Sequence, residues 1–72
     1  MTETDLIIKE FENDFKKRVE FQEIKPKSKR FYVMQCEFFM GAASALIAAG
    51  VLKEVPIKWS ICVMSSRSIL EN

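Results

Sequence analysis

The sequence predicts an all-α fold, a small three-helix bundle with a buried central helix that is completed by a second copy of the chain. Residues 31–51 are almost continuously apolar and contain no proline. Residues 8–19 repeat apolar side chains at helical spacing. A helix that is apolar nearly all round must be covered nearly all round, and two short helices of one chain can hardly do this.

Size and charge restrict the classes of protein that this chain can represent. Its 72 residues suffice for a single helical domain spanning residues 1–72, and a domain of this size often needs a disulfide, a metal or oligomerisation. A formal net charge of +1 gives no overall electrostatic case for nucleic acid or an anionic membrane. The acidic, polar N-terminal residues do not resemble a secretory signal, so we expect a cytoplasmic protein.

The first helix is expected to begin at Thr2 and to end before Pro26. The Thr2 side chain can accept a hydrogen bond from the amide near Asp5, and early carboxylates suit the positive end of the helix dipole. Pro26 disfavours helical geometry at Lys25. The apolar face of this helix carries Ile8, Phe11, Phe15 and Val19.

The link that follows, residues 25–30, is basic and polar, and Ser28 can cap the next helix. Its cationic side chains form a predicted basic patch: Lys25, Lys27, Lys29 and Arg30. Such a cluster can contact phosphate groups or an acidic protein surface, although a solvated turn has the same composition.

The central helix is expected to run to about Ala49, with Gly50 as its C-terminal stop. Arg30, Glu37 and Ser44, each seven residues apart, form its thin polar stripe. Small residues allow another helix to approach closely, either from the same fold or from a twin chain. The predicted oligomer interface consists of Phe38, Gly41, Ala42, Ala45 and Ala49.

The last third of the chain is ambiguous between helix and strand. Pro56 suits the first turn of a helix. Alternating Trp59, Ile61 and Val63 favour a strand, whereas the helical spacing that begins at Trp59 favours a helix. A lone strand would have no partner in this chain, so we predict a helix. A strand exchanged between two copies is the alternative for residues 57–64.

Five residues of this segment form a candidate ligand-binding set: Lys58, Trp59, Ser65, Ser66 and Arg67. An arginine fork and serine hydroxyls match phosphate oxygens, and an indole can stack on a nucleobase. An oligomer could therefore hold an anionic nucleotide between copies. No glycine-rich phosphate loop accompanies the set, and Arg67 at a polar helix end, close to the negative pole of the helix dipole, is the simpler interpretation.

Other chemistry is poorly represented. The chain has no histidine, the usual general base, and no cluster of carboxylates, so we expect no enzyme. Cys36 and Cys62 cannot complete a tetrahedral zinc site without histidine, and we expect neither metal nor cofactor. A DNA-reading third helix would need Arg, Asn or Gln where this one offers mainly Ile, Cys, Val and Met.

A membrane span over residues 31–51 is a further alternative, because the length is right. Gln35, Glu37 and Ser44 oppose it, since an acid at the middle of a membrane costs about 2.5–3.5 kcal/mol on insertion scales.

Two motifs resemble a known group of proteins. Residues 38–46, FFMGAASAL, and the pair PIKW (56–59) and MSSRSI (64–69) are similar to patterns in small uncharacterised helical proteins of bacteriophages and prophages. The resemblance implies a phage context, in which such proteins often inhibit host machinery or host defence, and some bind signalling nucleotides. We therefore expect a non-enzymatic accessory protein that binds and modulates a partner protein, with nucleotide sequestration as the alternative.

Overall fold

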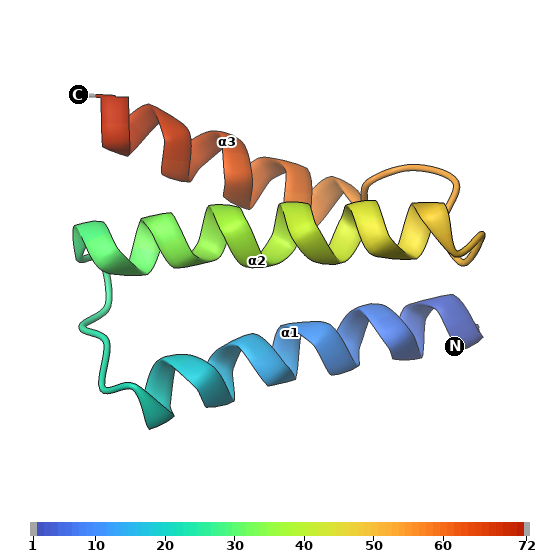
Figure 1. Cartoon of the computed structure of the whole chain (residues 1–72), viewed down its shortest axis with the longest axis horizontal. Helices are drawn as coiled ribbons and strands as arrows, with labels where there is room; N and C mark the ends of the chain where they lie inside the picture. Colours follow the sequence, from blue (N-terminus) through green and yellow to red (C-terminus); the bar gives the residue numbers. More distant parts are fainter. Residues whose placement is uncertain (1, 72) are drawn as a thin grey trace.

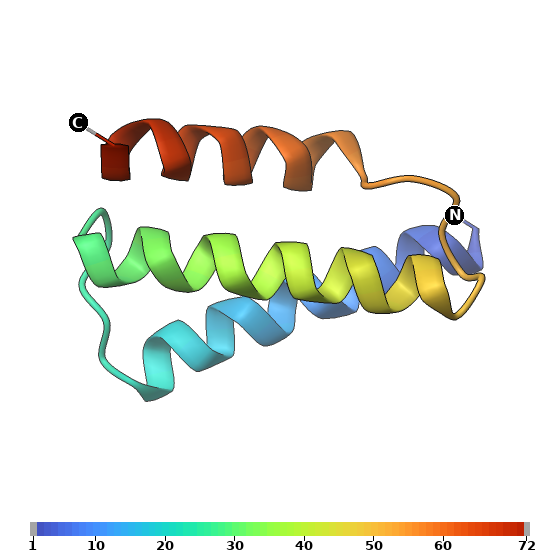
Figure 2. The same cartoon turned by 45° about the horizontal axis from the view of Figure 1, so that its top comes forward.

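A computed structural model describes residues 2–71 and confirms the all-α fold, a bundle of three helices. They are α1 (Glu3–Phe21), α2 (Lys29–Ala48) and α3 (Ile57–Glu71). Figure 1 shows α2 between the other two and antiparallel to each, and Figure 2 shows α1 crossing behind α2 at an angle. Residues 57–64 are helical, so the strand alternative for them is wrong.

The starts of α1 and α2 lie where the sequence predicts them. The Thr2 hydroxyl accepts from the Asp5 amide at 3.2 Å, and the Asp5 carboxylate accepts from the Thr2 amide at 3.3 Å. This reciprocal pair is a capping box, which satisfies two amides that the helix itself leaves free. Ser28 caps α2 by accepting from the Phe31 amide at 3.2 Å.

The end of α2 confirms the stop predicted at Gly50. This residue has a φ of 79°, a left-handed conformation that glycine adopts without steric cost. The Gly50 amide donates to the Ile47 carbonyl, and the Val51 amide donates to the Leu46 carbonyl. These two bonds form a Schellman motif, which closes the helix. Pro56 lies immediately before α3, one residue earlier than the first-turn position predicted for it.

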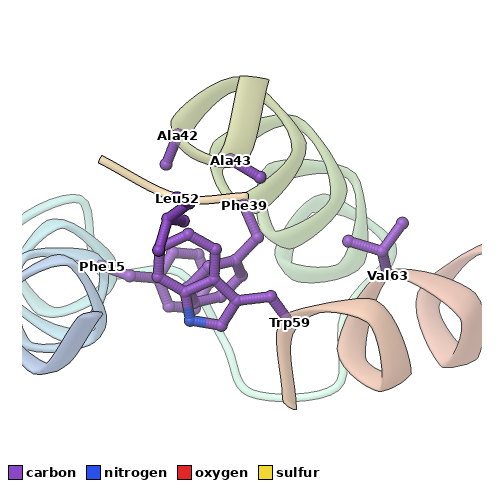
Figure 3. Close-up of a cluster of buried hydrophobic side chains, with 7 residues drawn as sticks. All are labelled: Phe15, Phe39, Ala42, Ala43, Leu52, Trp59 and Val63. Carbon is purple, nitrogen blue, oxygen red and sulfur yellow. The ribbon is translucent and has the colours of Figure 1, made fainter. Parts of the chain in front are cut away.

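An aromatic cluster joins the three helices. Phe15 of α1, Phe39 of α2 and Trp59 of α3 point toward one another (Figure 3). The ring centroids of Phe39 lie 5.1 Å from Phe15 and 5.2 Å from Trp59. Ala43 beside them has 1% of its surface exposed, so its small side chain lies at the closely packed contact between α2 and α3.

One chain leaves much of α2 uncovered. Its buried residues are Phe39, Ala42 and Ala43, which face the two neighbouring helices. The Cα framework measures 34 × 26 × 19 Å, an open arrangement in which α1 and α3 flank α2 without enclosing it. The expectation that two short helices cannot cover α2 is met, and its cover by a second copy stays a prediction.

Candidate functional site

The structure does not bring the predicted ligand-binding residues together. Trp59 and Ser66 are buried, with 1% and 0% of their surfaces exposed, whereas Lys58, Ser65 and Arg67 are exposed. The two buried residues lie seven positions apart, about two helical turns, and therefore share one side of α3. That side faces the core. The other three lie on the solvent side of α3.

Trp59 is a core side chain. Its ring lies edge-on to Phe11 at 6.1 Å and is tilted against Phe39 at 5.2 Å. The indole nitrogen points away from α2 and has no hydrogen-bond partner among the described residues (Figure 3). A nucleobase could stack on this indole only after the aromatic cluster had opened.

Ser66 is also used inside the fold. Its hydroxyl donates to the Gln35 side-chain oxygen at 3.3 Å, and one turn away the Cys36 thiol lies 3.6 Å from the Val63 carbonyl oxygen, to which it donates. Two polar contacts therefore fix the register of α3 against α2. The helical row that begins at Trp59 includes Ser66 and indicates its inward position, but nothing in the sequence indicates the hydrogen bond to Gln35.

The five residues of the predicted oligomer interface differ in how far the rest of the chain covers them. Phe38 packs against α1, with its ring centroid 5.4 Å from that of Phe15, and the Arg18 guanidinium lies 5.5 Å from the Phe38 centroid. Ala42 is buried beside it. The remaining three residues are exposed: Gly41, Ala45 and Ala49.

A ridge of large apolar side chains runs along the outside of α3. Ile57, Ile61 and Met64 have 77%, 58% and 68% of their surfaces exposed, and we call these three residues the α3 ridge. They follow an i, i+4, i+7 spacing, which places them in one row on the side opposite Trp59. None of the three is among the site residues predicted from the sequence, although their helical spacing is visible there.

A second apolar surface lies along α2 and the turn that follows it, away from both neighbouring helices. Its large members are Val33, Met40, Ile47 and Val51, each with 37–38% of its surface exposed. Exposed Glu37, Gly41, Ser44 and Ala48 lie between them. We call these eight residues the outer face of α2. Glu37 is its one charged residue, so most of the predicted polar stripe lies within an otherwise apolar surface.

All four residues of the predicted basic patch are exposed, on the α1–α2 link and the start of α2: Lys25, Lys27, Lys29 and Arg30. Arg30 donates to the Gln22 side-chain oxygen at 3.2 Å. A cleft of 220 Å³ beside the patch is lined by Lys27, Lys29, Tyr32, Ile69 and Leu70.

A larger cleft of 680 Å³ lies between α1 and the start of α3. Its charged lining residues balance in sign: Asp5, Lys9, Glu12, Lys16, Glu54 and Lys58. A mixed lining of this kind selects neither an anion nor a cation.

Metal-ligating residues do not cluster anywhere within residues 2–71. Cys36 and Cys62 are half-buried free thiols. Helix α2 is long and apolar enough to cross a membrane by length and composition, and 17% of that segment is buried within the chain.

No protein-family model, curated protein or solved structure matches this chain.

Proposed function

We propose that this protein is a non-enzymatic accessory protein that binds a partner protein and modulates it. The observation that carries the proposal is the α3 ridge, which exposes Ile57, Ile61 and Met64 by 58–77% on a helix already held in place by its opposite face. The ridge is inserted into an apolar groove on the partner protein.

The geometry of the ridge supports a groove as its target. Rows of apolar side chains at i, i+4 and i+7 are the usual anchors of a helix that binds in a hydrophobic groove. Complete burial of one such side chain contributes about 1.5–3 kcal/mol. The ordering of α3 against α2 lowers the entropic cost of binding, because the anchors are positioned before the partner arrives.

Charge and context define the kind of binding further. The ridge itself is uncharged, and exposed Lys58 and Arg67 lie at its edges, which matches the apolar centre and polar rim of protein interfaces. The resemblance of residues 38–46, 56–59 and 64–69 to small phage proteins supports a role as an inhibitor of host machinery or host defence.

Affinity capture with ridge variants tests the proposal. Ile61→Glu places a charge in the centre of the ridge and should abolish capture of the partner protein. Ser65→Glu is the matched control, because it adds the same charge to an exposed position of α3 outside the ridge, and it should retain the partner. Circular dichroism confirms that both variants are folded.

The captured protein is then purified and titrated with the three chains by calorimetry. Equal affinity for Ile61→Glu and the unsubstituted chain would contradict the proposal. A panel of signalling nucleotides in the same calorimeter distinguishes the sequestration alternative, which requires heat of binding from at least one of them.

A further inference from the structure

We propose that the outer face of α2 is covered by the same face of a second copy of this chain, with the two α2 helices antiparallel and crossing near Met40 and Gly41. This proposal goes beyond partner binding and does not use the α3 ridge. Three observations support a second copy as the occupant: the surface area of the chain, the position of Gly41 and the placement of Glu37 relative to Ser44.

The chain exposes more surface than a compact monomer of its mass. Its accessible surface is 5494 Å². The surface-to-mass relation of folded monomers gives about 4,600 Å² for 8.4 kDa, so the excess is about 900 Å². A protein–protein interface of standard size buries about 800 Å² on each partner. The excess is therefore close to the share that one protomer contributes to an ordinary dimer.

No steric contact within a single chain requires a glycine at position 41. Gly41 lies in the middle of α2, where glycine weakens a helix relative to alanine because it restricts the unfolded chain less. A Cβ atom built at Gly41 would meet nothing within 4 Å, so no neighbour inside the chain requires the absence of a side chain. Gly41 lies next to Met40 on the outer face, and its small size lets a second helix pack closely there.

The polar residues of the outer face favour two antiparallel copies. Glu37 and Ser44 lie at equal distances on either side of the point between Met40 and Gly41. An antiparallel crossing at that point places each Glu37 opposite Ser44 of the second copy, whose hydroxyl can donate to the carboxylate. A parallel arrangement would instead place the two Glu37 carboxylates together, which is unfavourable.

A membrane fits this face less well than a second copy does. Helix α2 is packed on one side by α1, whose outward residues include Lys9, Lys16 and Lys17. Inserting α2 into a bilayer in this fold would bring those charges toward the hydrocarbon, together with Glu37. A second copy covers the apolar residues and also offers a hydrogen-bond donor to Glu37.

Sedimentation equilibrium of the full chain tests the proposal. The unsubstituted chain should sediment at twice 8.4 kDa and dissociate on dilution. Gly41→Leu places a large side chain between the two α2 helices and prevents their close approach. Both copies carry the substitution at the same contact, so the dissociation constant of the dimer should rise by about a hundredfold or more. Ala48→Glu, an exposed position on the same face, provides a second variant in case Gly41→Leu alters the fold. Ile61→Glu on the α3 ridge is the control and should dimerise like the unsubstituted chain.

Several outcomes would overturn the proposal. A mass of 8.4 kDa at every concentration would show that no second copy binds. Unchanged dimerisation of Gly41→Leu and Ala48→Glu, or loss of dimerisation in Ile61→Glu alone, would place the contact elsewhere. Co-flotation of the purified chain with phosphatidylcholine–phosphatidylglycerol vesicles, lost in Ala48→Glu, would assign the outer face to a lipid bilayer.

Discussion

Ser66 shows how strongly the burial of a single residue depends on its position around the helix. It has no exposed surface, and its hydroxyl donates to Gln35 across the α2–α3 contact. Ile61 and Met64, which are far more apolar, lie on the solvent side of the same helix. Taken one by one, the hydrophobicity of these three residues would place them the other way round. Ser66 faces inward because it shares one side of α3 with Trp59 and Val63, which are buried in the core.

Substitution of Ser66 tests this structural role. Ser66→Ala removes the hydrogen bond and should lower the free energy of unfolding by about 1 kcal/mol, since Gln35 is only half-buried and can bind water instead. Ser66→Leu adds volume at a fully buried position and should cost about 1–3 kcal/mol. Urea unfolding followed by circular dichroism measures both. If Ser66→Leu were as stable as the unsubstituted chain, Ser66 would not be buried.

Substitution of Trp59 gives a second prediction at the scale of one residue. Trp59→Ala removes the indole from the aromatic cluster and should destabilise the protein by about 3–5 kcal/mol. Trp59→Phe keeps an aromatic ring and removes a buried N–H group that has no described partner, so it should cost much less. Urea unfolding of the two variants checks the order. Equal losses for phenylalanine and alanine would contradict a packing role for the ring.

At the scale of the element, the two glycines of the chain have opposite roles. Gly50 ends α2 with a φ of 79°, whereas Gly41 lies within the helix, and neither would bring a Cβ atom within 4 Å of a neighbour. The backbone conformation alone therefore decides the effect of alanine at each position.

This contrast predicts opposite changes in stability. Gly50→Ala forces alanine into the left-handed region and should lower the free energy of unfolding by about 1 kcal/mol. Gly41→Ala should raise it by about 0.4–1 kcal/mol, because alanine restricts the unfolded chain. Thermal unfolding at a concentration where the chain is monomeric compares the two. A loss of stability in Gly41→Ala under these conditions would show that α2 uses Gly41 within a single chain.

The boundaries of the elements could be predicted from the sequence, because they depend on local chemistry. Thr2, Ser28 and Gly50 lie at the helix ends predicted for them, and Phe15 packs into the core as its spacing indicates. The helical state of residues 57–64 followed from the lack of a strand partner. The helical row that begins at Trp59 and includes Val63 and Ser66 is the buried side of α3, so its inward side follows from the spacing. The hydrogen bond that Ser66 makes there could not be predicted, because it depends on how α3 is placed against α2.

At the scale of the whole molecule, the surface of α2 divides into a part that faces α1, a part that faces α3 and the outer face. The chain supplies helices for the first two parts only. The aromatic cluster packs α2 against both α1 and α3, and the Gln35–Ser66 hydrogen bond adds a polar contact with α3. The sequence predicted that a side would remain open, but it could not identify which one. That side depends on the crossing of α1 behind α2, a tertiary feature that apolar periodicity does not encode (Figure 2).

Disulfide trapping tests most directly whether α2 packs against α2. In a chain carrying Cys36→Ser and Cys62→Ser, Met40→Cys places one thiol beside the proposed two-fold axis, and Ile61→Cys places one on the α3 ridge instead. We expect Met40→Cys to form a disulfide-linked dimer rapidly under mild oxidation, because the paired thiols are held within bonding distance, and Ile61→Cys to react slowly. Equal rates for the two chains, or faster linkage through Ile61→Cys, would contradict the placement of a second copy on the outer face of α2.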